Sequence, residues 1–490
     1  MQVPLQQTST ADREDTDPTV PAQEKIRLAL QQAQQNCDAA QWSATIAACE
    51  AAIAQCQKLI HPATHSAAST NPDRTAAALY QAKGDLFKKQ GSLTEAIAAY
   101  QQALALNPEA NEIATALGDL YLTQARQLQQ SDETVAATHL YLKALTHAPR
   151  LFTAYSKLRY NLLRYDIPRG DPLLQAVVKT CQSILAKHPN IQPARITLAY
   201  ALTKLNRLPQ AIACYRSIAT SPEDASRRAP DFIVIGAEKS GTTSLHQYLR
   251  SHPQVIPPVE KEIDFFDLEY SCGLDWYLAH FPPASSKLAE PDSPNQASLG
   301  QTHWITGETS ANYLYSDVAP TRIFDCFPRV KLAVILRNPV DRTVSRYNMM
   351  VRNGTEKRDL ATAMTAEIDI IQQATTGDNI AWKALNRCRH IGNSLYYHHL
   401  KRWLAVFPQE QLIVLQSEDL FEQPEQTMQQ LYGQLGLASN RSPQKYPPHN
   451  TGEYQPANSE VQQQLATFFT PYNRKLEQLL NRSFRWETNS

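Results

Sequence analysis

The chain has 490 residues, which is too long for one ordinary domain and predicts roughly two to four. Apolar residues make up 42% and charged residues 19%, as in folded soluble proteins, and the formal net charge is zero. This balance gives no support to nucleic-acid or membrane-surface binding driven by bulk charge. Eight cysteines without a C-x-x-C pair argue against a disulfide scaffold and against a zinc site.

Residues 1–24 are polar, contain proline and lack periodicity, so we predict that they are disordered. This stretch has no apolar core and carries acidic residues early, which does not fit a signal peptide. No apolar run approaches the roughly 20 residues needed to cross a bilayer. We therefore expect a cytoplasmic protein without a membrane span.

Residues 25–222 are rich in alanine, glutamine and leucine at helical spacing, and they contain an internal repeat. Small residues at fixed positions let two antiparallel helices approach closely, aromatic residues fill the gaps, and a proline ends the second helix. These are tetratricopeptide positions, and their joint match in one repeat-length window disfavours a generic helical bundle. The matching positions are Tyr80, Gly84, Phe87, Ala96, Tyr100, Ala103 and Pro108.

The next repeat begins near Asn111, and its second helix is displaced by an insertion at 127–133, which we interpret as a lengthened turn between the helices. Weaker repeats are expected at 25–62 and 191–222, and 151–190 fits two helices. Such a solenoid offers a concave surface, so we expect it to bind a peptide or a protein partner. A flexible insertion is predicted at 61–75.

After a linker predicted at 223–230, short apolar strands alternate with helical segments through residues 231–488. This pattern predicts an α/β domain with a buried parallel sheet, following the all-α repeat domain. A surface loop is expected within it at 284–300. The predicted strands are 232–235, 331–336 and 411–416.

The first predicted strand leads through a glycine-bearing loop into a helix. Gly236 and Gly241 have the spacing of a P-loop, but Thr242 stands where that motif has its lysine, and Lys239 comes two residues before the second glycine. Backbone N–H groups and the helix dipole at a helix start favour an anionic ligand. A P-loop nucleotide phosphotransferase remains an alternative, disfavoured by the position of the lysine.

The second strand is followed by Arg337, and Ser345 comes eight residues later in a helical segment. Because ligands of parallel sheets bind beyond the carboxyl ends of the strands, Arg337 is expected to reach the same crevice as Lys239. Its planar guanidinium suits a terminal phosphate. Separately, Glu262 lies just before an aromatic pair and is a candidate general base, although such a glutamate alone is more often an ordinary loop residue.

Together, these segments resemble the sulfotransferases that use 3′-phosphoadenosine 5′-phosphosulfate (PAPS), and most of all the heparan sulfate glucosaminyl 3-O- and N-sulfotransferase branch. The resemblance covers residues 231 to about 487 and implies a P-loop-like sulfotransferase fold, PAPS as co-substrate and no metal. The segments that carry it are GAEKSGTTSL, KEIDFFD, ILRNPVDRTVSRYN, LYYHHLKRWLAVFPQEQLIVLQSEDL and PYNRKLEQLLNRSFRW.

The resemblance also implies roles for individual residues. Lys239 contacts the 5′-phosphosulfate and assists the leaving oxygen, Glu262 is the catalytic base, and Arg337 and Ser345 bind the 3′-phosphate. The loop positions that it assigns to the donor are Ser240, Gly241, Thr242, Thr243 and Ser244. In the late loop 446–456 and just before it, His449 and Lys445 are candidates for closing over the donor.

Two departures from the family pattern bear on the acceptor. Thr309 stands where the family has a lysine, and Asp264 stands where its members often have histidine or glutamine. The missing cation weakens the case for a polyanionic acceptor. A carbohydrate acceptor is favoured, with a peptide or a small molecule as alternatives. A repeat scaffold with an inactive enzyme domain is the remaining alternative, and the presence of Lys239, Glu262 and Arg337 argues against it.

Overall fold

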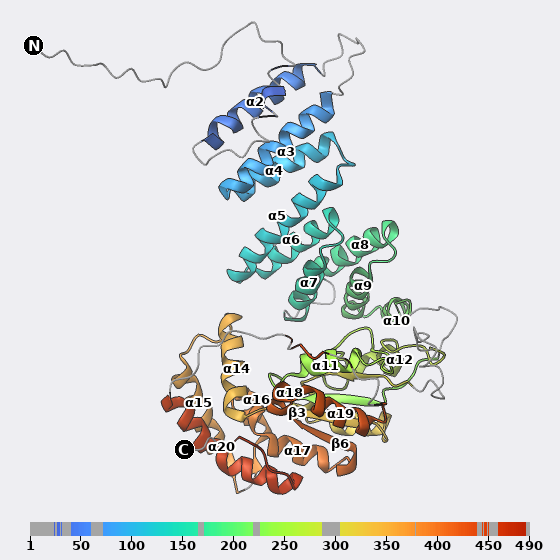
Figure 1. The fold of residues 1–490 in the computed structure, drawn as a ribbon, viewed down its shortest axis with the longest axis vertical. Coiled ribbons are helices and arrows are strands. Elements are labelled where there is room, and N and C mark those ends of the chain that lie inside the picture. The colour runs from blue at the N-terminus through green and yellow to red at the C-terminus, as the bar shows by residue number, and fades with distance from the viewer. Residues whose placement is uncertain are drawn as a thin grey trace, which may run out of the picture. The chain divides into compact units, whose positions relative to one another are not determined.

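The structure is a computed structural model that describes residues 41–59, 72–164, 171–218, 226–286, 304–377, 379–438 and 459–486, with isolated positions at 24, 27–29, 31, 443, 445–447 and 449. The predicted disordered N-terminus, the insertion at 61–75 and the loop at 284–300 lie largely outside these ranges. The chain forms two compact units, Met1–Ala194 and Arg195–Ser490 (Figure 1).

The first unit consists of helices that pack as successive antiparallel pairs, with α3 against α4 and α5 against α6 (Figure 1). This arrangement confirms the predicted all-α repeat architecture. Its helices are α2 (Trp42–Leu59), α3 (Pro72–Gln90), α4 (Leu93–Leu106), α5 (Asn111–Gln130), α6 (Thr134–His147), α7 (Phe152–Arg164) and α8 (Pro172–Lys187).

Small residues decide how closely these helices approach. A Cβ on Gly84 would lie 3.1 Å from the ring of Tyr100 on the next helix. A Cβ on Gly118 would lie 2.5 Å from the Cβ of Ala148, which is too close for any side chain without a backbone shift. At Gly118 the space is already filled, and at Gly84 a Cβ would press on the ring of Tyr100, so close helix packing and not conformational freedom favours glycine at both positions.

The insertion at 127–133 does not form a lengthened turn, so that interpretation was wrong. Helix α5 continues to Gln130, and only a short turn separates it from α6. Gln129 explains the extra helical turn: its amide donates to Asn161 at 2.9 Å and accepts from the hydroxyl of Tyr141 at 2.6 Å. These hydrogen bonds stabilise the extended end of α5, whose glutamine and leucine residues are already good helix formers.

The second unit contains a parallel sheet with strand order β2-β1-β3-β6. The three strands predicted from apolar runs are confirmed, each to within one residue of its predicted bounds. The strand β2, which pairs with β1, was not predicted, since three residues that include a glutamate give no strand pattern. The strands are β1 (Phe232–Gly236), β2 (Gly307–Thr309), β3 (Lys331–Leu336) and β6 (Leu412–Gln416).

Helices follow the carboxyl ends of three of these strands: α11 (Thr242–Arg250) after β1, α14 (Pro339–Arg352) after β3, and α18 (Ser417–Glu422) after β6. The remaining helices of this unit are α9 (Gln192–Lys204), α10 (Leu208–Arg216), α12 (Leu274–Leu278), α13 (Ala319–Cys326), α15 (Leu360–Gln373), α16 (Trp382–Arg387), α17 (Tyr396–Leu404), α19 (Pro424–Leu435), α20 (Ser459–Leu480) and the short helices η2 (Phe265–Glu269), η3 (Tyr270–Cys272), η5 (Tyr313–Tyr315), η6 (Gly392–Ser394) and η7 (Gln409–Gln411). A two-stranded ladder joins β4 (Thr375–Thr376) to β5 (Asn379–Ile380).

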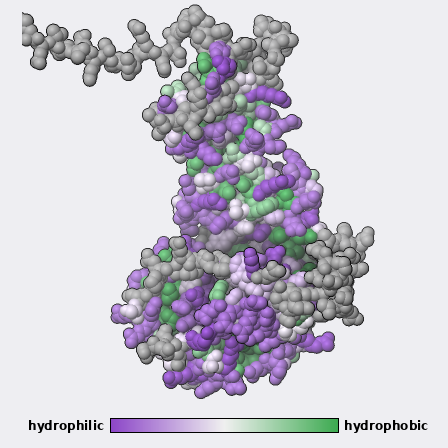
Figure 2. Space-filling view, in the orientation of Figure 1, coloured by the Kyte–Doolittle hydropathy of each residue, from purple (hydrophilic) through white to green (hydrophobic). Residues whose placement is uncertain are grey.

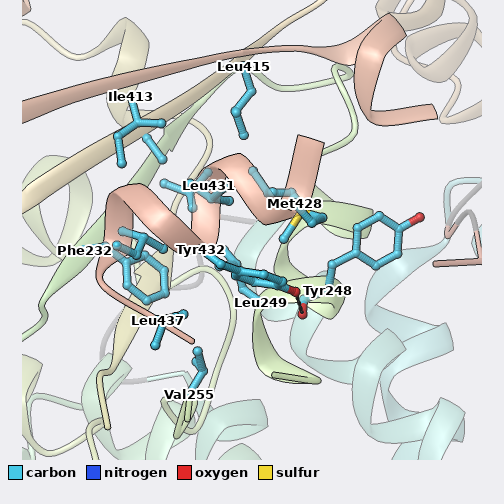
Figure 3. Packing of buried hydrophobic residues seen from close by; sticks show 14 of the residues in the cluster. Phe232, Tyr248, Leu249, Val255, Ile413, Leu415, Met428, Leu431, Tyr432 and Leu437 are labelled. Atoms are coloured by element: carbon cyan, nitrogen blue, oxygen red, sulfur yellow. Dashed lines mark hydrogen bonds between the residues drawn. The ribbon is translucent and has the colours of Figure 1, made fainter. Parts of the chain in front are cut away.

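The hydrophobic core beside the sheet is formed by side chains of the strands, α11 and α19 (Figure 3). Tyr432 of α19 donates its hydroxyl proton to the carbonyl of Tyr248 on α11 at 3.0 Å, which ties the two helices together inside this core. On the face drawn in Figure 2, the described residues are mostly hydrophilic, with hydrophobic residues in small groups. Burial of these apolar side chains thus holds α11, and with it the loop before it, against the sheet.

Helices α9 and α10, which the sequence pattern counts among the repeats, pack on the α/β unit. The boundary between the two compact units falls inside α9. The ring of Tyr215 on α10 meets Trp276 edge-on, and the Trp276 indole N–H donates to Thr203 of α9 at 2.8 Å. Lys204 forms an ion pair with Glu269 at 2.8 Å. The linker at 223–230 is only partly described, and it stays a prediction.

Candidate active site

A cleft of about 610 Å³ lies at the carboxyl ends of the strands, where the loops leading into α11, α14 and α18 meet. It brings together most of the residues predicted from separate segments of the sequence. Those that line it are Lys239, Gly241, Thr242, Thr243, Glu262, Arg337, Ser345 and His449.

The loop before α11 presents the start of that helix to the cleft. Gly241 caps the helix with φ of 98°, a left-handed conformation that strains other residues, and a Cβ there would lie 3.1 Å from the ring of Phe421. The N–H of Ala237 donates to Ile335 of β3 at 2.9 Å, which fixes the base of the loop. The first-turn N–H groups of α11 and its positive dipole end therefore favour an anion in the cleft.

Lys239 and Arg337 approach each other across this loop. An Nη1 N–H of Arg337 donates to the carbonyl of Lys239 at 3.4 Å, and the Nζ of Lys239 lies 3.7 Å from the Sδ of Met349 on α14. Lys239 itself adopts a left-handed backbone with φ of 71°. The two cations predicted from two strand ends thus line one cleft, as expected.

Glu238, which sequence reasoning missed, fastens the loop to α14. Its carboxylate forms ion pairs with the fully buried Arg342, at 3.4 Å, and with Arg346. Arg342 also donates to the carbonyls of Glu238, at 3.2 Å, and His390, at 2.9 Å. Burial lowers the pKa of Arg346, and the charge of Glu238 offsets part of that shift. The i, i+4 spacing of the two arginines on one helix was the available signal.

Ser345 supplies the observation that best tests the fit of a phosphate. Its side chain is buried and lines the cleft, yet its Oγ has no hydrogen-bond partner among the described residues. A buried hydroxyl without a partner is costly, and native proteins rarely leave one. Arg337 lines the same cleft. A hydroxyl donor and a guanidinium that face one cleft fit a phosphate group.

Lys261 links the candidate base to the first turn of α11. Its Nζ lies 2.7 Å from a carboxylate oxygen of Glu262 and 3.3 Å from the hydroxyl of Thr243. The sequence showed Lys261 only as a residue between two acids. At the position of the lysine that the family pattern expects, the Thr309 hydroxyl lies 3.2 Å from Nδ1 of the buried His246. Burial lowers the pKa of His246 to about 4, helped by the charge of Lys261. The cation beside Glu262 is therefore Lys261.

Comparisons with known proteins agree with this geometry. Residues 229–451 match the family model described as sulfotransferase domain, and residues 84–124 match the model described as TPR repeat. The match to the sulfotransferase domain lies within the second unit. The predicted family resemblance and the predicted tetratricopeptide repeats are both confirmed.

The relatives that match the sulfotransferase domain differ in overall length. The chain is 27% identical over 327 residues to the membrane-associated sulfotransferase kil1 of Dictyostelium discoideum, covering 53% of this chain and 66% of that protein. It is 32% identical over 224 residues to the human bifunctional heparan sulfate N-deacetylase/N-sulfotransferase 2, covering 44% of this chain and 23% of that protein. A solved sulfotransferase from Alicyclobacillus acidocaldarius is 25% identical, with 52% and 98% covered and a TM-score of 0.39.

The Dictyostelium relative is named as membrane-associated. Within the described ranges, no helix of this chain combines the length and the apolar character that crossing a membrane requires. The predicted location in the cytoplasm is not tested by these observations and stays a prediction. The absence of a metal also stays a prediction.

Not every predicted site residue of the second unit reaches the cleft wall. Ser240 and Ser244 are buried, and the Oγ of Ser244 accepts the backbone N–H of His449 at 3.0 Å, which brings the late loop to α11. Lys445 is exposed and is not part of the described wall of the cleft. Its assignment to the donor stays a prediction.

Sequence reasoning also missed the wall that follows β6. Ser417, Glu418, Phe421 and Glu422 of α18 line the cleft. The rule that placed Arg337 was available for them too, because they come directly after the carboxyl end of a predicted strand. They were passed over because their helix shows no cation or glycine that suggests a phosphate.

Glu308, which is fully buried, lies close to two half-buried acids, Asp264 and Asp267. Burial raises the pKa of Glu308 to about 7 and that of Asp267 to about 6, and it raises the pKa of Asp264 well above its usual value. Glu308 accepts hydrogen bonds from Tyr277 and Ser310, which oppose this shift. The charge of Asp267 adds to the shift in both of the other acids.

The titration of Glu308 predicts how stability depends on pH. Between 4.5, its ordinary pKa, and about 7, the folded state binds a proton that the unfolded chain has released, so stability falls as pH rises through this window. Glu308→Gln removes this loss, which amounts to at most about 3 kcal/mol. Urea unfolding of the wild-type and Glu308→Gln proteins at about pH 5 and about pH 8 measures this loss as the difference between their pH dependences. Asp264 and Asp267 titrate in both proteins, so their contributions cancel in that difference. Parallel pH dependences would contradict a titration of Glu308 in this window.

Proposed function

We propose that the protein is a PAPS-dependent sulfotransferase that transfers a sulfuryl group to a hydroxyl or amine of an acceptor. The observation that carries this proposal is the buried Ser345 hydroxyl, which has no hydrogen-bond partner among the described residues and lines the same cleft as Arg337, Lys239 and Glu262. A ligand with two phosphate groups would supply acceptors for this hydroxyl and for the cations of the cleft. The match to a sulfotransferase domain supports the same reaction class.

The chain's own residues suit this co-substrate at each of its charged groups. Lys239 and the first turn of α11 would hold the 5′-phosphosulfate, and Arg337 and Ser345 would hold the 3′-phosphate. When bound, PAPS supplies an activated sulfuryl group whose leaving group is a phosphate. Because the 3′-phosphate contacts are remote from the reacting sulfur, their binding energy goes into alignment.

Glu262 is the group placed to take a proton from the acceptor. Its side chain is 46% exposed at the cleft, so an acceptor has access to it. Positioned proton transfer of this kind contributes typically about 10²–10⁴-fold to a rate. Lys239 and the N–H groups of α11 would offset the negative charge that gathers on the leaving phosphate.

A carbohydrate is the acceptor that we favour, by analogy with relatives named for heparan sulfate. Peptides and small molecules are the other classes. The repeats would recruit the acceptor or a protein partner through their concave surface, in the cytoplasm. The match of residues 84–124 to a TPR repeat supports the role of a binding surface, and no nucleic acid or metal is part of the proposal.

Two measurements test the function. Calorimetry compares 3′,5′-bisphosphoadenosine with ATP and magnesium as ligands of the full chain, and only the bisphosphate is expected to bind well. Incubation with ³⁵S-labelled PAPS and a cell extract is expected to yield a labelled product whose identification reveals the acceptor. Tight binding of ATP with magnesium, and none of the bisphosphate, would replace this proposal with a nucleotide phosphotransferase.

The 3′-phosphate site makes a separate prediction. Arg337→Ala is expected to weaken binding of 3′,5′-bisphosphoadenosine by about 10–100-fold, as for loss of a charge-assisted bond, and to leave adenosine 5′-phosphate binding nearly unchanged. Arg352→Ala, at the other end of α14 and exposed, is the matched control. Calorimetry measures the affinity of each variant for both nucleotides. An equal loss of affinity for the two nucleotides would show that Arg337 does not bind the 3′-phosphate.

A further inference from the structure

The backbone that carries Glu262 is held by side chains at the end of β2. The N–H groups of Ile263 and Asp264 both donate to the Oγ of Ser310, at 3.2 and 3.1 Å. Asp264 has a left-handed backbone with φ of 50°, so these residues lie outside regular secondary structure. The two N–H groups that directly follow Glu262 therefore depend on one hydroxyl.

A second hydroxyl holds the next part of the same segment. The N–H of Phe266 donates to the hydroxyl of Tyr313 at 3.3 Å. Ser310 and Tyr313 in turn donate their own protons to the carboxylate of Glu308, at 2.6 and 3.2 Å. A hydroxyl has a single proton, so once Glu308 accepts it, only lone pairs remain to face the backbone N–H groups. Glu308 thus fixes the orientation of both hydroxyls.

We propose that Glu308 is a positioning residue for the transfer reaction: through Ser310 and Tyr313, its carboxylate fixes the backbone that presents Glu262 to the cleft. This inference rests on the proposed function of Glu262 as the base. Glu308 does not line the described cleft and is fully buried, so it acts only through the segment that it supports.

Energetics favour this role over a purely stabilising one. Burying a carboxylate costs free energy, and replacing a buried charge with a residue of similar shape is often neutral or stabilising. The burial of Glu308 beside Asp264 and Asp267 is therefore poorly explained by stability alone. A rigid arrangement of hydroxyls, which the ionised and acceptor-only form of Glu308 imposes, is what the carboxylate adds.

Tyr277 provides a matched control. It donates to the same carboxylate at 2.7 Å from α12, while the N–H groups of Ile263, Asp264 and Phe266 donate to the other two hydroxyls. Tyr277→Phe and Ser310→Ala each remove one hydrogen bond of similar length to Glu308. Only the second also releases the segment after Glu262.

The experiment uses the full chain and two readouts. Hydrogen exchange followed by mass spectrometry is expected to show faster exchange at 260–270 in Ser310→Ala, and unchanged exchange there in Tyr277→Phe. Turnover with PAPS is expected to fall by about 10-fold or more in Ser310→Ala, since small displacements of a catalytic group cost up to about 100-fold, with the KM for PAPS nearly unchanged. Ser310→Thr, which keeps the hydroxyl, is expected to restore both.

Glu308→Gln completes the test. The amide N–H₂ of the glutamine donates to one of the hydroxyls, and that hydroxyl then has to turn its own proton toward the backbone N–H groups. Its effect on turnover is expected to be non-additive with Ser310→Ala, as for residues that act as a unit. Equal losses in Ser310→Ala and Tyr277→Phe, or unchanged exchange at 260–270 in Ser310→Ala, would overturn the inference. A wild-type chain that binds no 3′,5′-bisphosphoadenosine would instead overturn the proposed function, while the exchange data would still decide whether the segment is held as described.

Discussion

Glu262→Gln is expected to lower turnover by about 10²–10⁴-fold, the usual contribution of a positioned general base. The amide has nearly the same shape as the carboxylate but cannot take a proton from the acceptor. Binding of 3′,5′-bisphosphoadenosine is expected to stay the same or to tighten slightly, because the change removes a negative charge from a cleft that binds an anion. Steady-state kinetics and calorimetry on the same preparation separate these two effects.

Glu260→Gln is the control for this change. Glu260 lies two residues earlier in the same segment and is not part of the described wall of the cleft. The same chemical substitution there is expected to leave turnover within about threefold, as for changes away from the site. If Glu262→Gln abolished donor binding, or if both variants lost turnover equally, Glu262 would be a structural residue and not the base.

The parts of the site that sequence reasoning found share one physical property. Lys239 and Arg337 each follow a run of buried apolar residues, and the carboxyl ends of parallel strands meet at one edge of a sheet. Apolar runs are visible in sequence, so the residues that follow them inherit a predicted position. The same rule would have found the wall formed by α18, which was missed only because its residues do not suggest a phosphate.

The supporting residues were missed for a different reason. Glu238 pairs with Arg342, more than a hundred positions along the chain, and Glu308 accepts the hydroxyl proton of Ser310, which in turn accepts N–H groups of a segment that lies far away in sequence. Such contacts follow from tertiary packing, and no local period announces them. A buried glutamate in a three-residue strand resembles an exposed loop residue when only the sequence is known. Here that glutamate, Glu308, accepts the hydroxyl protons of Ser310 and Tyr313, which hold the backbone after Glu262.

The domain boundary illustrates the same limit. Alanine and aromatic spacing marks α9 and α10 as a repeat, yet Tyr215 and Thr203 contact Trp276 of the α/β unit. The pattern predicts the kind of helix pair correctly, because pair packing is local. It does not show which neighbour covers the outer face of the last pair.

Lys239→Ala is expected to lower turnover by about 10²–10³-fold, the cost of removing one group that stabilises charge in a transition state. Alanine is the appropriate replacement because Lys239 has a left-handed backbone, and alanine keeps the Cβ and therefore the same backbone strain. Glycine would relieve that strain and change the loop as well as the charge. Binding of 3′,5′-bisphosphoadenosine is expected to weaken by only about 10-fold, since the N–H groups of α11 and Arg337 remain.

Single-turnover kinetics with labelled PAPS measure the chemical step directly, and Lys401→Ala on the exposed side of α17 is the control for loss of a lysine. Lys239→Arg adds a second comparison. It restores the charge but places it on a planar group, so binding is expected to recover more than turnover does. A rate that falls only in proportion to donor binding, with an unchanged chemical step at saturation, would make Lys239 a binding residue. The lysine before the second glycine would then contribute to donor binding and not to the departure of the phosphate.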